Sequence, residues 1–533
     1  LRTSFKMLLF LHSVPVLLVS SAAAILLGTI VYRLVFHPLA NIPGPKIAAI
    51  TRIWLAYHSR KGNNHEFEPA LHRKYGPVVR ISPNEVMVCS EQGVRTTYSA
   101  GSLFIKAPWY QVCAAPDSRR KGVERFDLFT EMDKERYRSQ RRAIGPAYSI
   151  AGMEKHEHLL NTYLAKFLAK MRSLNGDWIS LSEWMHIFAL DALSTFTVSK
   201  SVDYTSQGND GENMVASDKH WGYFTVVGLF PWIVYITQRI PRFSMILMVP
   251  VSLVLGLKIP TGLPIFRFVV PNIITRLSKL ESTASARMPA DRPGLETSSD
   301  GPKDLLASLM QLHTSKGARF HPSWVLGIAI TNFGAGHDTM AITLSSCVYQ
   351  IASNLVAKER LVKELREAGI GQGTGYTETV NRIPYLLACV KEAMRMNPAI
   401  GASMPRIVPE PGVTFAGHYL PPGTTVGVNP WALHYDPTIF SSPEEFQPER
   451  WLSNGTEDDK SRIGRMDACW LGFGGRSRSC PGQYLARFFV VKALVGMFGV
   501  GGFNVEVRGE PEFKGWFSVH MNARTEVRFA VRR

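Results

Sequence analysis

The sequence predicts a mainly helical protein with small β-sheets, built as a single catalytic domain behind one transmembrane helix. Three observations carry this prediction. The amino end holds an uncharged apolar stretch, the middle is rich in segments of helical length, and short strand-like segments bounded by Pro and Gly lie toward both ends. Length alone would divide 533 residues into three or four units of about 150 residues. The motifs described below instead place distant residues in one site, which favours a single domain.

The amino end predicts a membrane anchor. Residues 14–32, VPVLLVSSAAAILLGTIVY, carry no charge and have about the length that crosses a hydrocarbon core. A cleaved signal peptide is the alternative, but its apolar stretch would be shorter and would end in a small-residue cleavage site. We expect an anchor over residues 7–36, a proline-rich hinge over 37–48 and the catalytic domain over 49–533. Positive residues after the anchor, beginning with Arg33, favour a cytosolic body.

The body is expected to be helical between two regions of short strands. Strands are predicted at 77–81, at 85–88 and at several places within 405–430. Helices are predicted at 156–172, 184–199, 322–352, 377–396 and 483–498.

Two stretches differ from the rest of the body. Residues 282–303 are polar and rich in turn formers, which predicts a surface loop. Residues 221–270 are very apolar, but the most apolar part, 243–257, is only 15 residues long and contains a proline. We expect this part to dip into the membrane interface, with a second transmembrane helix as the alternative.

Composition excludes several classes of function. The net charge is +17, but no Lys/Arg run with interleaved aromatic residues is present, so nucleic acid is not an expected partner and the charge is read as a solvated surface that helps docking. None of the six cysteines forms a CxxC pair, which argues against a disulfide framework or zinc site and favours a reducing compartment. Five of them are expected to be core residues, and Cys480 is different.

Cys480 lies in the segment FGGRSRSCPGQ. Pro481 favours the start of a helix, so free backbone N–H groups should face the sulfur and favour its thiolate. A thiolate can ligate haem iron, and Arg478 could pair with a haem propionate. The alternative is a buried cysteine beside a chance turn.

This segment resembles the haem-binding loop of the cytochrome P450 family. Phe473, Arg478, Cys480 and Gly482 match the family pattern, and Cys480 would be the axial ligand of haem b. Arg476 departs from it, because the family usually has glycine there. We expect the local bend to use Gly475 instead and Arg476 to face a redox partner.

A second motif is Glu392-Ala-Met-Arg395, whose spacing of three puts both charges on one helix face. Together with Arg450 in FQPERW, it is similar to the buried Glu–Arg–Arg cluster of the same family, whose role is structural. An exposed ion pair is the alternative for Glu392 and Arg395 alone.

The segment Ala335-Gly336-His337-Asp338-Thr339 lies within the long predicted helix at 322–352. In the family this segment crosses the haem. The resemblance implies that Asp338 and Thr339 supply protons for oxygen activation and that Ala335 and Gly336 leave room for oxygen. His337 is assigned no role. The alternative is a helix with a packing glycine and a surface aspartate.

Two further arginines resemble propionate partners of the family. Arg141 follows Tyr137 by four residues, where the family usually has Trp or His instead of tyrosine, and a tyrosine can still donate a hydrogen bond. Arg406 follows Pro405 on the strand after the Glu392 helix. Each arginine could alternatively lie at the surface.

The resemblance covers residue 38 to the end and is closest to fungal members. It implies a monooxygenase that uses O2 and electrons from NADPH, delivered by a flavoprotein, NADPH-cytochrome P450 reductase, with cytochrome b5 as a further candidate partner. It also implies an endoplasmic reticulum membrane location with a single-pass anchor and a cytosolic domain. The substrate would be lipophilic, such as a terpenoid, polyketide or alkaloid. The expected pocket walls are 107–123, Phe333, 400–404 and 517–519.

Two other classes of function are open. A haem isomerase or dehydratase on the same fold would need no reductase, and a non-catalytic haem-binding or scaffold protein would need no proton path. Asp338 and Thr339 argue against both. A test of turnover that depends on NADPH and oxygen separates the three.

Overall fold

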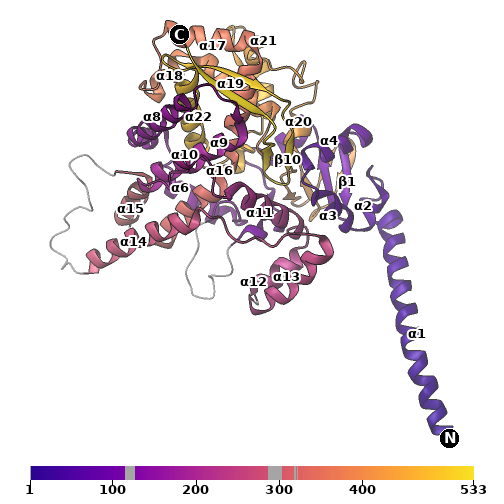
Figure 1. The fold of residues 1–533 in the computed structure, drawn as a ribbon. Helices are drawn as coiled ribbons and strands as arrows, with labels where there is room; N and C mark the ends of the chain where they lie inside the picture. The colour runs from indigo at the N-terminus through magenta and orange to yellow at the C-terminus, as the bar shows by residue number, and fades with distance from the viewer. Residues whose placement is uncertain are drawn as a thin grey trace.

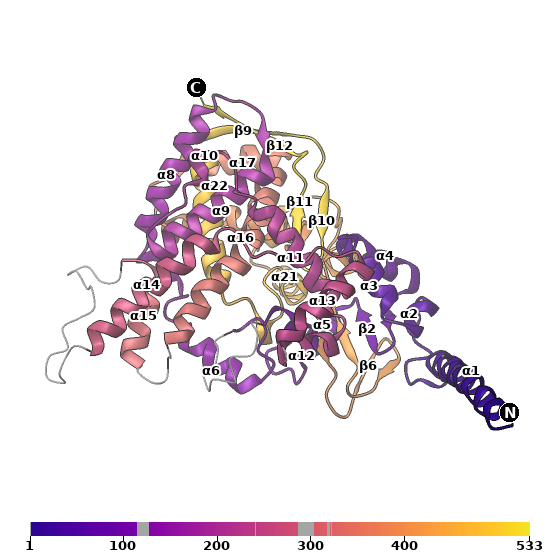
Figure 2. The same ribbon diagram turned by 60° about the horizontal axis from the view of Figure 1, so that its bottom comes forward.

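The computed structural model describes residues 2–114, 127–239, 241–285, 303–316, 320 and 322–532. Most of the helices pack into one body, and α1 (Arg2–Val31) projects away from it (Figure 1). In Figure 2, β9 (Phe503–Arg508) and β12 (Glu526–Val531) lie near the carboxyl terminus, at the edge of the body away from α1.

The helices fill most of the body. After α1 they are α2 (Lys46–Ile50), α3 (Ile53–Ser59), α4 (Asn64–Tyr75), α5 (Glu91–Tyr98), α6 (Lys134–Ile144), α7 (Ile150–Glu154), α8 (Glu157–Ser173), α9 (Leu181–Val198), α10 (Tyr204–Gln207), α11 (Asn213–Val227), α12 (Pro231–Arg239), α13 (Pro241–Leu255), α14 (Phe266–Ser285), α15 (Leu305–Lys316), α16 (Pro322–Ser353), α17 (Leu355–Glu367), α18 (Tyr376–Arg382), α19 (Pro384–Met396), α20 (Pro430–Leu433), α21 (Glu457–Cys469) and α22 (Gln483–Phe498).

The strands form small sheets at the edges of the helical body. One sheet has the order β1-β2-β8-β5-β3 and another the order β4-β12-β9, while β10-β11 and β6-β7 are hairpins. Their bounds are β1 (Val78–Ser82), β2 (Glu85–Val88), β3 (Ile105–Lys106), β4 (Ile179–Ser180), β5 (Arg406–Ile407), β6 (Val413–Phe415), β7 (His418–Leu420), β8 (Thr425–Gly427), β9 (Phe503–Arg508), β10 (Phe513–Gly515), β11 (Val519–Met521) and β12 (Glu526–Val531).

The long helix α16 runs through the core and packs most extensively against α9. A Cβ added at Gly336 would lie 3.2 Å from the Leu193 side chain of α9, so the glycine allows the two helices to approach closely. This corrects the expectation that Gly336 leaves room for oxygen, because the position faces a neighbouring helix.

The amino-terminal helix is the part of the described chain that is long and apolar enough on its own to cross a membrane, with the segment Leu17–Phe36 wholly outside the core. Its junction with the body is held by Arg80. The guanidinium of this buried residue donates to the carbonyl oxygens of Arg33 at 2.9 Å, Leu39 at 3.2 Å and Pro83 at 2.8 Å. One side chain therefore ties the helix end and the hinge to β1.

Several boundaries differ from the sequence prediction. The helix expected at 377–396 is two helices, α18 and α19, because Pro384 lacks an N–H and begins a new helix. The loop expected at 282–303 overlaps the last turn of α14, which reaches Ser285, and residues 286–302 lie outside the described chain. The segment expected at 243–257 is α13, whose 15 residues are short for a membrane span of about 20 residues.

Large apolar side chains are exposed on α12 and α13, at the lower edge of the body in Figure 1, the direction in which α1 projects. Leu253 and Val254 are 77% and 82% exposed, and Trp232, Tyr235 and Ile246 are exposed as well. An apolar patch of this kind on one edge is typical of a surface that contacts a partner or a membrane.

Candidate active site

The loop that leads to Cys480 is closed by its own backbone. The N–H of Cys480 donates to the carbonyl of Phe473 at 2.8 Å, and α22 begins three residues after the cysteine. The bend is made by Gly474, which has a left-handed φ of +73°. Gly475, where the sequence placed the bend, instead packs against Tyr98, because a Cβ there would lie 2.1 Å from the Cβ of Tyr98.

The electrostatics of Cys480 combine opposing effects. Burial raises the pKa of the thiol, whereas the N–H of Gly482 and the charges of Arg141 and Lys106 lower it, and burial outweighs the rest. The sequence predicted that the helix end would favour the thiolate. The helix end alone does not do so, because burial has the larger effect on the pKa of Cys480. A bound metal ion would, because a coordinating thiol loses its proton.

Cationic side chains surround this sulfur. Arg141 donates to the carbonyl oxygens of Ser479 at 2.8 Å and Cys480 at 3.3 Å. Arg478 lies with its guanidinium 3.9 Å from the ring centre of the buried Tyr137 and donates to two carbonyls of the loop before α6. Tyr137 thus holds an arginine in place rather than standing free.

The other two cations lie on paired strands. Arg406 of β5 is buried and donates to the hydroxyl of Tyr110 at 2.9 Å. Lys106 of β3 is its register partner, and its ammonium donates to the carbonyls of Leu128 and Phe129. Burial and the charges of Arg406 and Arg478 hold the pKa of Lys106 well below its usual range. Sequence analysis missed Lys106, because no motif marks it.

The four cations lack acidic partners. Within the described chain, no carboxylate lies within 4 Å of Lys106, Arg141, Arg406 or Arg478. Lys106 and Arg406 are buried, and buried positive charges are normally paired, so the group fits an anionic ligand. A haem has two propionates and an iron that takes a cysteine ligand, and the residues around Cys480 therefore fit that cofactor.

Glu392, Arg395 and Arg450 come together in the core. Both oxygens of Glu392 accept from Arg395, at 2.9 and 3.0 Å, and one accepts from Arg450 at 3.0 Å. Trp451 donates its indole N–H to Glu392 at 2.8 Å. Other N–H groups of the same two guanidinium groups donate to backbone carbonyls, including that of His434. The charges of these residues, which we call the Glu392 cluster, are therefore fully hydrogen-bonded.

The middle of α16 presents different residues to different sides. Ala335 is exposed, and the hydroxyl of Thr339 donates to its carbonyl at 2.8 Å, so these two share a face. Asp338 instead is buried on the side of α9 and α11. The acid and the alcohol that the sequence placed together are thus neighbours in the chain that face different surroundings.

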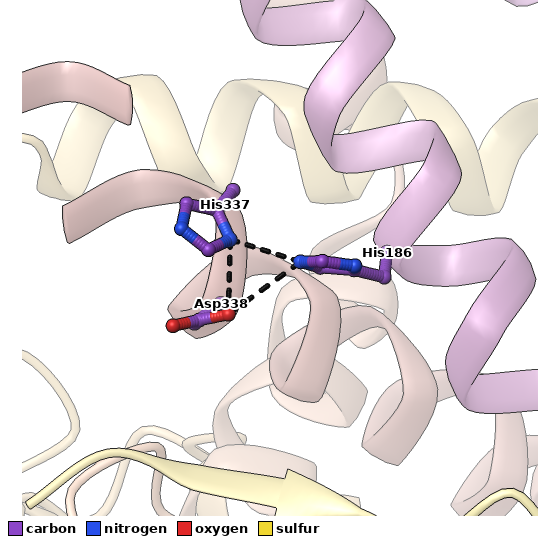
Figure 3. Close-up of side chains that lie close together, drawn as sticks. All are labelled: His186, His337 and Asp338. Carbon is purple, nitrogen blue, oxygen red and sulfur yellow. Dashed lines mark hydrogen bonds and ion pairs between the residues drawn. The ribbon is translucent and has the colours of Figure 1, made fainter. Parts of the chain in front are cut away.

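Asp338 is the centre of a buried polar cluster, which we call the Asp338 cluster (Figure 3). One carboxylate oxygen, Oδ1, lies 2.9 Å from His337 Nδ1, 3.5 Å from His186 Nε2 and 3.4 Å from His520 Nε2. The other, Oδ2, accepts from the indole of Trp221 at 3.1 Å and from the hydroxyl of Ser217. His337, assigned no role from sequence, contacts His186 at 2.9 Å as well.

The ligand atoms of His186, His337 and Asp338 lie within 4.8 Å of one another, close enough to hold a metal ion. The charges around these three residues favour bound protons rather than a bound metal ion. Burial would raise the pKa of Asp338, but the charges of His337 and His520 and the hydrogen bond with His186 lower it well below its usual range. Burial would lower the pKa of His520, but Asp338 and Asp218 raise it to about 10.

Three of the four expected pocket walls come together. Trp109, Ala402 and Phe517 belong to one apolar cluster, in which the Trp109 and Phe517 ring centres are 4.9 Å apart. Residues 115–123 lie outside the described chain. Phe333 does not join them, because it is fully buried in the main core on another side of α16.

Comparisons with known proteins agree with this geometry. Residues 42–507 match the family model described as Cytochrome P450. Similar proteins include the cytochrome P450 monooxygenase sdnT of Sordaria araneosa, 35% identical with 87% of this chain and 86% of the relative covered, and cicH of Emericella nidulans, 28% identical with 87% and 88% covered. Pisatin demethylase of Fusarium vanettenii is 27% identical, with 91% and 88% covered.

A crystal structure of a cytochrome P450, CYP102L1, has the same fold. It aligns with a TM-score of 0.64 at 14% identity, covering 88% of this chain and 94% of that one. The fold similarity, the match over most of the chain and the named relatives agree with one another, and the chain therefore belongs to the cytochrome P450 family of haem-thiolate monooxygenases.

Proposed function

We propose that this enzyme oxidises a lipophilic specialised metabolite, using O2 and electrons that a flavoprotein reductase takes from NADPH. The observation that carries the proposal is the set of four cations without acidic partners around Cys480. Their charge suits the two propionates of haem b, and the sulfur suits its iron. The bound haem would supply oxygen activation, which a thiolate ligand promotes.

Each residue of the site has a distinct task in this proposal. Cys480 would ligate the iron. The carbonyl of Phe473 would shape its loop by accepting the Cys480 N–H, and Gly482 would donate its N–H to the sulfur. Arg141, Arg406 and Arg478 would hold the propionates, with Tyr137 positioning Arg478. Lys106 is added to this group because it shares its surroundings.

The α16 residues would handle protons and oxygen. Thr339 and Ala335 lie on the accessible face of the helix, where oxygen would be activated. Asp338, whose pKa is held well below its usual range, would pass a proton on toward Thr339, the next residue in the chain, rather than store it. The Glu392 cluster would act structurally, by fixing α19 to the loop that contains Arg450.

The substrate class rests on the relatives and on the pocket. Two of the named relatives are cytochrome P450 monooxygenases from fungi, and one is a pisatin demethylase. Trp109, Trp221 and Phe517 are aromatic, and as walls of the expected pocket they would suit an apolar molecule such as a terpenoid, polyketide or alkaloid.

The membrane assignment rests on two surfaces. The segment Leu17–Phe36 could cross the endoplasmic reticulum membrane and leave the body in the cytosol. The exposed apolar side chains of α12 and α13 lie on the edge toward which α1 projects (Figure 1), and would dip into the same membrane. Apolar substrate could then enter from the lipid.

The face outside the Cys480 loop would receive the reductase or cytochrome b5. Arg142 on α6 and Arg476 in the loop are exposed, and neither has an acidic partner within 4 Å in the described chain. The Arg142→Glu/Arg476→Glu double variant should lower reductase-driven turnover about tenfold at low salt, because charge steering governs association. The same reversals at Arg73 and Lys74 on α4 are the matched control. Equal loss in both variants would remove this surface from the proposal.

The test of the cofactor site uses two cysteine variants. Cys480→Ala should abolish the thiolate-type absorbance of the reduced, carbon-monoxide-bound enzyme, because no other sulfur can take its place. Cys469→Ala, at a buried cysteine of α21, should keep that spectrum. Survival of the spectrum in Cys480→Ala would refute the ligand assignment.

The reaction class is tested by turnover with fungal extract fractions as substrate sources. Product formation should require both NADPH with reductase and oxygen. Product that forms without either would refute the monooxygenase and favour an isomerase or dehydratase.

A further inference from the structure

Charged groups of alternating sign form a continuous chain through the body, with the Asp338 cluster at its centre (Figure 3). It connects α11 and the turn before it with α9, α16 and the β10-β11 hairpin. In order, its contacts are Asp210–His186 at 2.9 Å, His186–Asp338 at 3.5 Å, Asp338–His520 at 3.4 Å, His520–Asp218 at 2.6 Å and Asp218–Lys514 at 3.0 Å.

The two ends of this chain reach solvent, and its centre does not. The side chains of His186 and Asp338 are 1% and 2% exposed. At one end Asp210 is 13% exposed, and at the other Asp218 and Lys514 are 25% and 52% exposed. A proton can therefore enter from water at either end and reach the buried acid through one imidazole.

Both imidazoles have the same orientation relative to Asp338. His186 and His520 each turn Nδ1 toward an outer carboxylate, Asp210 and Asp218 respectively. Each then turns Nε2 toward Asp338 Oδ1, and His186 Nε2 also lies 2.9 Å from His337 Nδ1. A carboxylate on Nδ1 fixes the tautomer, so the nitrogen that faces Asp338 is the one that gains and loses the proton.

The charges along the chain balance when both imidazoles are protonated. Three carboxylates then face two imidazolium rings and the ammonium of Lys514. Burial would lower the pKa of His186, but Asp210 and Asp338 outweigh it and raise that pKa. The pKa of His337 is lowered, because burial lowers it more than Asp338 raises it. The further group that faces His186 is Glu183, whose pKa is raised by burial and by Asp210.

We propose that the Asp210–His186 and Asp218–His520 pairs are two proton-input arms that reload Asp338 during turnover. The inference rests on the proposed monooxygenase function, which consumes protons at the face of α16 that carries Thr339. In each step the Nε2 proton of one imidazolium passes to Asp338 Oδ1, leaving a neutral imidazole and a neutral carboxyl. The imidazole regains a proton from water, and the carboxyl proton leaves toward Thr339. One proton moves and no electrons do.

The chemistry of oxygen reduction provides a readout that needs no identified substrate. Without a substrate, O2 that takes up four electrons and four protons becomes two waters at the cost of two NADPH. O2 that takes up only two electrons and two protons leaves as hydrogen peroxide at the cost of one NADPH, and slower proton supply favours this second outcome. The ratio of NADPH to O2 consumed by the full-length haem enzyme with reductase therefore reports proton supply.

The variants are His186→Gln, His520→Gln and the double variant. The matched control is His158→Gln, at an exposed histidine of α8. We expect the peroxide share to rise in each single variant and by about tenfold in the double variant, while the control matches the wild type. If the double variant matches the control while NADPH is consumed, the arms are refuted and the monooxygenase stands. If the wild type consumes no NADPH, the proposed function itself fails.

A second measurement does not depend on turnover. In the reduced, carbon-monoxide-bound enzyme labelled at histidine Cε1, His520 should titrate with a pKa of about 10, and Asp338→Asn should move that pKa toward 6.5. A His520 pKa near 6.5 in both proteins would overturn the proposal. So would one equivalent of zinc that survives dialysis in the wild type and is lost in His186→Gln, because the nitrogens would then be metal ligands.

Discussion

Two of the buried carboxylates, Glu392 and Asp338, are surrounded by different kinds of positive group. Glu392 is held by two guanidinium groups and an indole, and the guanidinium groups also donate to backbone carbonyls. Asp338 is faced by three imidazoles and held by an indole and a hydroxyl from α11. In the Asp338 cluster, Asp338 Oδ1 and His520 Nε2 are buried without an aligned hydrogen bond.

This difference separates structural charge from working charge. A guanidinium keeps its proton at any ordinary pH, so the Glu392 cluster has one protonation state and one geometry. An imidazole changes charge near neutral pH, so the Asp338 cluster can exist in several states. The unaligned contacts of the Asp338 cluster allow a proton to move, whereas the complete hydrogen bonding of the Glu392 cluster does not.

The largest effect should come from breaking the Glu392 cluster. Glu392→Gln leaves the charges of Arg395 and Arg450 buried without a counter-ion, which should cost about 3–5 kcal/mol of unfolding free energy. Denaturant unfolding of the haem-bound enzyme measures this. The same substitution at Glu378, in an exposed pair with Arg382, should cost less than about 1 kcal/mol. Equal losses would mean that burial does not distinguish the two pairs.

The second effect is a pH dependence that only the Asp338 cluster should show. Because the pKa of His520 is raised from 6.5 to about 10, its contribution to stability is complete below about pH 6.5 and is lost as the pH rises toward 10. The advantage of the wild type over Asp338→Asn should therefore be about 1–3 kcal/mol at pH 6 and shrink at pH 9. Unfolding midpoints at both pH values measure it, and a constant difference would contradict the charged pairing.

The smallest difference between the two clusters is expected when their matched indoles are replaced. Trp451 donates to Glu392 and Trp221 donates to Asp338. Trp451→Phe should cost about 1.5–3 kcal/mol at every pH between 6 and 9, because the cations that hold its acceptor Glu392 are guanidinium groups rather than imidazoles. Trp221→Phe should cost less, because its side chain is only partly buried, and its cost should vary with pH. Identical pH profiles for both would erase the distinction between the clusters.

The parts of the site that the sequence predicts are those whose residues are close in the chain. Glu392 and Arg395 share a helix face at a spacing of three, and Cys480 precedes α22 within one turn. Such spacings fix geometry once the helix is assigned. The same reasoning misplaced the bend at Gly475, because only the packing of Tyr98 against that glycine distinguishes it from Gly474.

The parts that it does not predict depend on contacts between distant segments. His186 meets His337 across 151 residues, and nothing near either marks the other. Lys106 lacks a motif of its own, and its importance follows from pairing of β3 with β5. Gly336 is equally ambiguous, since a glycine in a helix can make space for a ligand or for a neighbouring helix, and here Leu193 of α9 takes the space.

Helix α11 connects the wall of the expected pocket with the groups around Asp338. Asp218, Ser217 and Trp221 all lie on α11, and Asp210 in the turn before it accepts the N–H of Met214 in its first turn. Trp221 also stacks on Phe517 at the pocket wall. A movement of α11 away from α16 would disconnect both outer carboxylates and both Oδ2 donors at once. One helix therefore carries both a residue of the expected pocket wall and the groups that hold Asp338 Oδ2.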